Sequence, residues 1–156
     1  MPQVLKAPTP LSHINASRTL FLAGSIEMGK AEDWQTRLTQ MLQNTPDLTI
    51  LNPRRDEWDA SWEQTITNPQ FREQVEWELA AQEKATLIAM YFAPETKAPI
   101  TLLELGLFSR SGKLIVCCPD GYWRKGNVEV VCNCYRIPLV ATFDELAAII
   151  HQELAP

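Results

Sequence analysis

Two glutamates stand at positions where a helix would normally bury apolar side chains. The segment from Pro99 to Arg110 is apolar nearly all round, and Glu104 is its only carboxylate. At 100° per residue Glu104 lies between Ile100 and Phe108, so the spacing predicts that it points into the protein. An isolated buried carboxylate costs several kcal/mol unless it is paired or neutralised. A chain keeps such a group for a structural ion pair or for chemistry, and we favour chemistry.

A second glutamate repeats this pattern in the segment from Phe71 to Lys84. Phe71, Val75 and Leu79 form a predicted apolar stripe, and Glu78 falls within it. Two inward carboxylates on helices that flank one strand can share a pocket, where one acts as nucleophile or base and the other orients substrate or donates a proton. The alternative is a solvated helix edge, because this helix is rich in acidic residues.

Small and polar residues follow two of the predicted strands. Gly24 and Ser25 end the first strand, where a small residue lets the backbone approach a ligand and a hydroxyl can bond a sugar or phosphate oxygen. The loop after the second strand carries Asn52, Arg54 and Asp56. These five residues are candidates for substrate binding, with a purely structural turn and surface ion pairs as the alternatives.

A third candidate loop has the sequence PDGYWRKGN and carries Trp123 beside Arg124. An aromatic ring with neighbouring cations suits a stacked base and a phosphate or a hydroxyl-rich sugar. Surface salt bridges are again the alternative. The glycine spacing after the first strand does not match the GxGxxG pattern of dinucleotide-binding folds.

The elements that must position these residues alternate between strand and helix. Short apolar runs predict strands at 18–24, 47–51, 85–92, 113–118 and 137–141, and helical patterns cover 30–44, 69–84, 99–110, 128–135 and 143–154. This alternation predicts an α/β fold with a parallel sheet covered by helices on both faces. We expect the flavodoxin-like, doubly wound order 2-1-3-4-5 for five strands, with ligands beyond their carboxyl ends.

Length and charge bound the class of protein. The chain of 156 residues fits one domain at 18–156, preceded by an irregular leader at 1–17 that contains Pro2, Pro8 and Pro10. A net charge of −5 provides no basic field for polymeric nucleic acid or an anionic membrane. No apolar run approaches the roughly 18 residues of a membrane span, and the first residues lack a signal-peptide pattern. We therefore expect a cytoplasmic protein with a small ligand.

Cysteine and histidine usage argues against metal chemistry. The pairs Cys117-Cys118 and Cys132-x-Cys134 match neither zinc-ligand nor CxxC redox spacing, and only two histidines are present. We expect free thiols that are buried or partly buried, no metal and no cofactor.

Five segments in order resemble the nucleoside 2-deoxyribosyltransferase-like proteins, from about Arg18 to about Val140. The segments are FLAGSI, LNPRRDEW, VEWELAA, PITLLELGLFSRSGKLIVCCP and YWRKGNVEVV. The resemblance implies that Glu104 attacks C1′ of a 2′-deoxynucleoside and forms a covalent deoxyribosyl ester. A second base, or water, then takes the sugar with net retention. Nucleosides and free bases are the implied small-molecule partners.

The resemblance also implies roles for two further residues. Glu78 matches a carboxylate that holds the sugar hydroxyls and the nucleophile. Asn127, in RKGN, matches an asparagine that reaches the 5′-hydroxyl of a substrate bound in the neighbouring subunit. The implied assembly is therefore a homo-oligomer with shared sites.

The chain departs from the family pattern at the residue that handles protons on the base. Well-studied transferases have an aspartate six residues before the nucleophile, where this chain has Ala98. Glu95, Asp56 or a water could take that role. Besides a deoxyribosyltransferase, two functions stay open: an N-glycosidase that hydrolyses nucleosides or nucleoside 5′-monophosphates, and a non-catalytic nucleotide-binding module.

Overall fold

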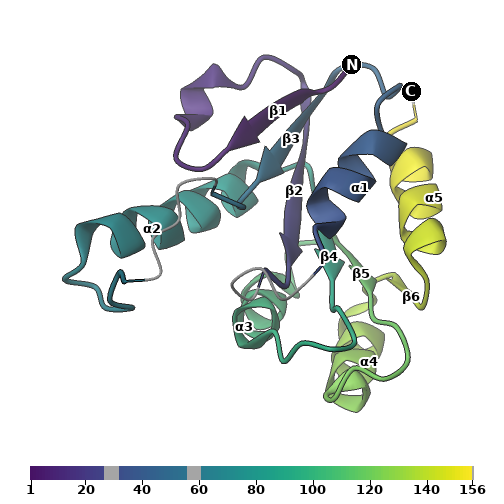
Figure 1. Ribbon diagram of the computed structural model, residues 1–156. Helices are drawn as coiled ribbons and strands as arrows, with labels where there is room; N and C mark the ends of the chain where they lie inside the picture. The colour runs from purple at the N-terminus through teal and green to yellow at the C-terminus, as the bar shows by residue number, and fades with distance from the viewer. Residues whose placement is uncertain (27–31, 56–60, 156) are drawn as a thin grey trace.

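The computed structural model describes residues 1–26, 32–55 and 61–155. Figure 1 shows a parallel sheet with helices on both sides. In chain order the elements are β1 (Gln3–Lys6), the 3-10 helix η1 (Leu11–His13), β2 (Arg18–Gly24), α1 (Trp34–Met41), β3 (Leu48–Asn52), α2 (Pro69–Lys84), β4 (Leu87–Tyr91), α3 (Pro99–Phe108), β5 (Leu114–Cys117), α4 (Lys125–Tyr135), β6 (Leu139–Val140) and α5 (Phe143–Glu153). None of the helices in these ranges is long and apolar enough to cross a membrane.

The sheet has six strands in the order β1-β3-β2-β4-β5-β6. Five of them keep the predicted order 2-1-3-4-5, but the predicted strand count of five is wrong. The sixth strand comes from residues 1–17, for which no regular structure was predicted. Gln3 pairs with Thr49 in register, and the Thr49 hydroxyl donates a 2.7 Å hydrogen bond to the Gln3 side chain. The prolines at 2, 8 and 10 flank these four strand residues without entering them.

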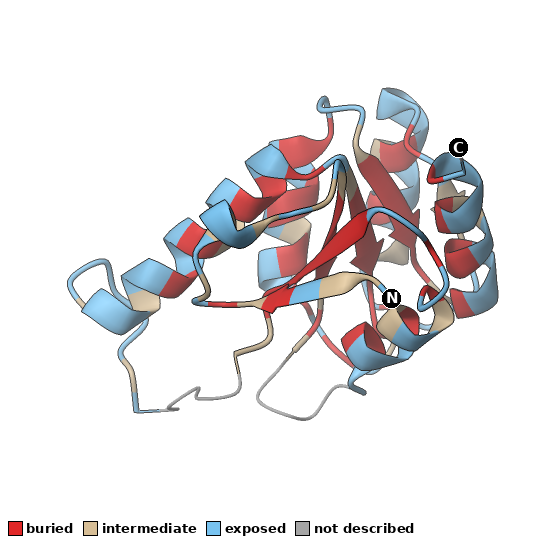
Figure 2. Ribbon diagram, turned by 90° about the horizontal axis from the view of Figure 1, so that it is seen from above, coloured by how far each residue is buried: buried red, intermediate tan, exposed pale blue. Residues whose placement is uncertain are grey.

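Two layers of helices cover the sheet. Helices α1 and α5 pack on one face, around a core that includes Trp34, Leu38 and Phe143. Helices α2, α3 and α4 pack on the other face, around a core that includes Trp77 and Leu105. Figure 2 shows the strands buried between these layers, with the exposed residues on the outer sides of the helices. Burial on both faces explains why the strands are continuously apolar in sequence.

The helix that carries Glu78 begins where its sequence predicts. The Asn68 side chain accepts a 3.0 Å hydrogen bond from the backbone N–H of Phe71, and Pro69 occupies the first helical position. Asparagine caps an unpaired N–H there, and proline has no N–H to leave unpaired. By contrast, α1 is shorter than the predicted 30–44 at both ends: the Asp33 side chain caps it just before Trp34, and the helix ends at Met41.

The turn at the end of β2 has no room for a side chain at Gly24. A Cβ atom built there would lie 2.7 Å from the Tyr91 carbonyl oxygen and 2.9 Å from Cε2 of Trp34. Trp34 is fully buried, so its ring cannot withdraw. Glycine is therefore required at this position by the packing of β2 against α1 and β4.

We expect Gly24→Ala to lower the free energy of unfolding by about 1–3 kcal/mol, the usual effect of overpacking a core. Urea denaturation would measure the change. Gly106→Ala is the matched control: a Cβ at Gly106 meets nothing within 4 Å, and alanine favours a helix over glycine by about 1 kcal/mol. Equal unfolding free energies for Gly24→Ala and the unchanged protein would contradict the steric argument.

Candidate active site

The buried side of α3 carries Glu104. Its side chain is only 7% exposed, and Thr101, Leu105 and Phe108 are buried on the same helix. The predicted neighbour Ile100 is instead exposed, since the apolar residues of α3 also cover its outer side. The carboxylate nevertheless points inward, because it lies on the buried side of the helix between Thr101, three residues before it, and Phe108, four residues after it.

The buried face of α2 differs from the predicted stripe. Val75 and Leu79 are 36% and 39% exposed, so the predicted apolar stripe is wrong. The buried residues of this helix are Gln74, Trp77, Ala81 and Gln82. Glu78 is half-buried between them, at the centre of a polar row with Gln74 one turn before and Gln82 one turn after. Two buried amides therefore flank the carboxyl group along α2.

A hydrogen bond joins the two helices at Glu104. The Gln82 amide nitrogen donates to Oε2 of Glu104 at 2.7 Å, and it lies 3.2 Å from the backbone oxygen of Glu78. Gln82 is fully buried. The other buried amide, that of Gln74, donates to the backbone oxygen of Pro53 at 2.8 Å and so ties α2 to the loop after β3.

Burial perturbs both carboxyl groups in the same direction. It raises the pKa of Glu104 to about 7, while the bond from Gln82 acts against that rise. It raises the pKa of Glu78 to about 8, and the negative charge of Glu104 adds to this effect, while a bond with Gln74 lowers it. Near neutral pH, Glu104 is thus partly ionised and Glu78 mostly protonated. Such a difference between neighbouring carboxyls suits a nucleophile and a proton donor.

The end of β2 is bound to the loop before α3. Ser25 is buried, and its hydroxyl lies 2.7 Å from that of Thr96. The Trp34 indole donates to the backbone oxygen of Ser25 at 3.2 Å. Gly24 and Ser25 therefore hold the backbone of the sheet edge in place, and the Ser25 hydroxyl already has a protein partner.

Asn52 shapes the turn after β3. Its side-chain oxygen accepts a 3.0 Å bond from the backbone N–H of Arg54. The Arg54 guanidinium donates to Gln35 at 3.3 Å and lies 3.4 Å from Asp33, both on or next to α1. Asp56, the last candidate in this loop, lies outside the described residues.

The adjacent arginines form the ion pairs that the structural alternative anticipated. Arg54 faces Asp33, and Arg55 pairs with Glu73 on α2. Within the part of the chain that the structure describes, Nη1 of Arg55 is buried and has no hydrogen-bond partner, and Nε of Arg54 has only the Asp33 carboxylate, 3.4 Å away. These two ion pairs link the loop after β3 to the start of α1 and to α2.

Trp123 fastens the loop before α3 from the other side. Its indole donates to the backbone oxygen of Lys97 at 3.0 Å, and the Tyr122 hydroxyl donates to the same oxygen at 2.6 Å. The ring is half exposed and lies 4.4 Å from the Arg124 guanidinium. Asn127 is exposed on the first turn of α4.

The structure brings Glu78 and Glu104 into electrostatic contact and places the other described candidates at the carboxyl edge of the sheet. Sequence reasoning missed Gln74 and Gln82, although their spacing of four residues on either side of Glu78 was a usable signal. It also missed Thr96, the partner of Ser25. These residues orient the candidates without being acidic or basic themselves.

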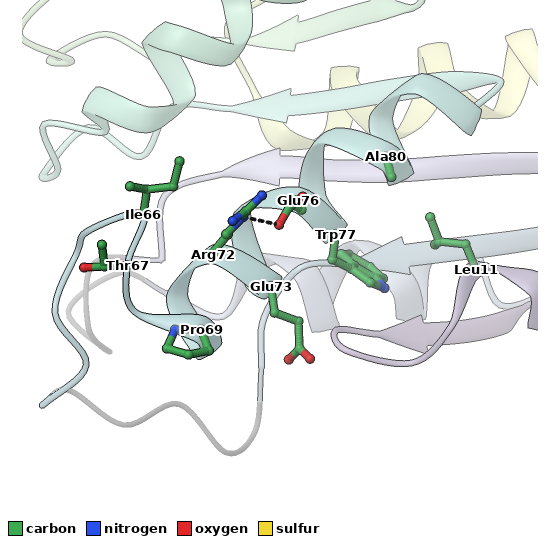
Figure 3. A pocket seen from close by; sticks show the side chains of 9 residues that line it. All are labelled: Leu11, Ile66, Thr67, Pro69, Arg72, Glu73, Glu76, Trp77 and Ala80. Atoms are coloured by element: carbon green, nitrogen blue, oxygen red, sulfur yellow. Dashed lines mark hydrogen bonds and ion pairs between the residues drawn. The ribbon is translucent and has the colours of Figure 1, made fainter.

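An open groove of about 930 Å³ lies elsewhere, on the outer side of α2. Leu11, Ile66 and Trp77 form its apolar walls (Figure 3). Arg72 and Glu76, which also line the groove, form an ion pair at 2.9 Å. None of the predicted site residues that the structure describes lines this groove. The groove is thus separate from the carboxyl pair.

The thiols are free, as expected. Cys117, Cys118 and Cys132 are buried as predicted, whereas Cys134 is exposed, so the prediction of burial is wrong for this thiol. Burial raises the pKa of the first three well above neutral, so they stay protonated and weakly nucleophilic. In the described ranges, no group of three or more His, Cys, Asp or Glu residues is placed to hold a metal ion.

Comparison with known proteins identifies the family. The family model described as nucleoside 2-deoxyribosyltransferase like matches residues 17–122, more than half of the chain. Both carboxyl residues, Glu78 and Glu104, lie within the match, whereas Trp123 and Asn127 follow it. No curated protein matches the chain significantly.

The raised pKa values make stability depend on pH. A carboxyl whose pKa is higher in the folded than in the unfolded state binds more protons when folded, so stability falls as pH rises between the two values. For Glu104 this interval runs from about 4.5 to about 7. We expect Glu104→Gln to raise the free energy of unfolding by up to about 3 kcal/mol at pH 9 and by much less at pH 4.

Urea denaturation at pH 4, 7 and 9 measures this difference. Glu83→Gln, a change of the same charge at an exposed position on α2, is the control and should leave stability nearly unchanged. A pH-independent effect of Glu104→Gln would contradict the burial argument.

Proposed function

The chain belongs to the nucleoside 2-deoxyribosyltransferase-like family, and we propose that it exchanges bases on 2′-deoxynucleosides through a covalent deoxyribosyl-glutamate intermediate. The observation that carries this proposal is the buried carboxyl pair. Glu104 lies 2.7 Å from an amide donor, and Glu78 is close enough for the charge of Glu104 to raise its pKa. A carboxylate kept at this cost suits the attack on a sugar carbon.

In the first step, ionised Glu104 attacks C1′ of the deoxynucleoside. A C1′–O bond forms while the C1′–N bond to the base breaks, and its electron pair passes to the base nitrogen. The transition state resembles an oxocarbenium ion, whose positive charge the carboxylate stabilises. In the second step, a nitrogen of another base attacks C1′ and passes its proton to the group that protonated the first base, the ester bond breaks, and Glu104 regains its negative charge. Two inversions give net retention.

The departing base needs a proton, and we assign its donor as Glu78. Burial raises the pKa of Glu78 to about 8, so this carboxyl carries a proton at neutral pH. The family aspartate cannot supply it, because that position is Ala98, which is buried and offers only a methyl group. Protonation neutralises the leaving base and lowers the barrier to breaking the glycosidic bond.

A second candidate is hydrolysis of nucleoside 5′-monophosphates. The buried Nη1 of Arg55 favours it, because no described residue accepts a hydrogen bond from it and, next to the end of β3 at the carboxyl edge, it could donate to a phosphate. Water would then replace the second base in the second step. Chromatography of the reaction products distinguishes both reactions from the third possibility, a module that binds nucleotides without turnover.

We expect a new deoxynucleoside to appear only when purified protein is incubated with a deoxynucleoside and a second free base, because the ester waits for a nucleophile. Chromatography of the products measures this. Glu104→Ala should reduce the exchange rate about 1,000-fold or more, the scale of losing a nucleophile. Glu83→Gln is the control for charge and should retain the rate.

Free base without exchange would support the hydrolase instead. No product from nucleosides or their monophosphates would contradict both enzymatic proposals.

We further propose that Asn127 completes the site of a neighbouring subunit, which its exposed position at the start of α4 permits. Mixing and reassembling inactive Glu104→Ala with weakened Asn127→Ala should then recover activity, because some mixed sites contain both native residues. Exchange rates before and after mixing are compared. An Asn127→Ala protein with unchanged activity, or no recovery on mixing, would contradict a shared site.

A further inference from the structure

The amide of Gln82, at the contact between α2 and α3, is unusual because only its nitrogen is hydrogen-bonded within the described part of the chain. Its nitrogen serves two acceptors, Oε2 of Glu104 at 2.7 Å and the backbone oxygen of Glu78 at 3.2 Å. Its oxygen is buried and has no hydrogen-bond partner among the residues that the structure describes. The side chain is fully enclosed, so no exposed surface supplies the missing partner.

An unpartnered buried oxygen destabilises the fold, and an apolar side chain of the same length would avoid that penalty. The donor half of the amide, by contrast, is directed at the one carboxylate on α3. The orientation of this amide follows from its neighbours, since only the nitrogen can donate to an ionised carboxylate. Gln82 is therefore better explained by what it does to Glu104 than by packing.

We propose that Gln82 is the positioning residue of the nucleophile: its N–H holds Oε2 of Glu104, keeps the carboxylate ionised in its buried setting, and leaves Oε1 to bond the sugar carbon. The role in catalysis rests on the proposed function of Glu104. The effect on ionisation does not, because it follows from the contact alone.

The bond suits both states of the reaction. Before attack, the N–H stabilises the negative charge that burial disfavours. When Oε1 bonds C1′, Oε2 becomes the carbonyl oxygen of the ester and still accepts the same N–H. The Glu104 carboxyl group therefore keeps one orientation through both steps. Holding it in the reactive geometry lowers the entropic part of the barrier.

The backbone of Gln82 is itself held. The ammonium of Lys113, the residue just before β5, donates to the backbone oxygens of Gln82 and Glu83, at 3.2 Å and 2.6 Å. Lys113 thus fixes the last turn of α2 against the sheet. Among the described residues, the charged groups that these contacts place near the Gln82–Glu104 pair are Glu78 on α2, whose ionisation opposes that of Glu104, and the Lys113 cation, which donates to backbone carbonyls.

Gln82→Met tests this role, because methionine keeps the length of the side chain and removes the donor. We expect the titration midpoint of Glu104 to rise by about one pH unit or more, as a lost bond to a charged group implies. Carboxyl-carbon NMR of glutamate-labelled protein measures the midpoint, with Glu104→Gln identifying the signal. At pH 6, where the ionised fraction of Glu104 limits the rate, kcat/KM of the variant should be about tenfold lower than that of the native protein. At pH 9 it should be less than about threefold lower.

Gln74→Met is the matched control: it removes a second buried amide from the same face of α2 without a bond to Glu104. It should not raise the Glu104 midpoint, because losing the Gln74 bond keeps the neighbouring Glu78 protonated to higher pH. An unmoved midpoint in Gln82→Met, or a loss of rate by one factor at every pH, would overturn the proposal. A raised midpoint in a protein that exchanges no bases would sustain the effect on ionisation and refute the proposed function instead.

Discussion

The hydrogen bond between Gln82 and Glu104 is the interaction on which the proposed chemistry of the site depends. It joins α2 to α3 at a buried carboxylate, and burial would otherwise keep that carboxylate protonated at neutral pH. Each helix must therefore be held in a fixed register relative to the other. The doubly wound sheet provides this, because α2 and α3 pack on the same face against β2 and its neighbours.

The loop that leads into α3 is held from both sides. Ser25 bonds Thr96 from the end of β2, and Tyr122 with Trp123 bonds the Lys97 carbonyl from the loop after β5. Ser25 and Trp123, which were predicted to bind ligand, thus form hydrogen bonds within the protein. They set the start of the helix that presents Glu104, and so they act on the site through the backbone.

Much of the fold could be predicted because its signals are local. Strands β2 to β6 are apolar runs separated by helical patterns, and a parallel sheet follows from their alternation. Strand β1 escaped prediction because prolines at 2, 8 and 10 surround only four strand residues, whose pairing with β3 is a distant contact. Element type is thus easier to predict from sequence than a partner far along the chain.

The site was predictable only in part. The buried position of Glu104 was predictable because a carboxylate in an apolar helix contradicts its surroundings. The stripe Phe71–Val75–Leu79 was misleading, since Val75 and Leu79 are exposed while the amides of Gln74 and Gln82 are buried. From hydrophobicity alone, valine and leucine would be expected inside and glutamine outside, which is the reverse of what is observed. A search for apolar periodicity therefore could not have identified Gln82. Its role depends on a contact between helices that only the folded chain brings about.

Rapid quenching followed by mass spectrometry tests the central claim most directly. Protein mixed with a 2′-deoxynucleoside and quenched during turnover should yield the peptide that contains Glu104 with an added deoxyribosyl group, and the Glu104→Gln protein should yield none. Base exchange that proceeds at full rate while this peptide stays unmodified, or an adduct on another residue, would contradict Glu104 as the nucleophile.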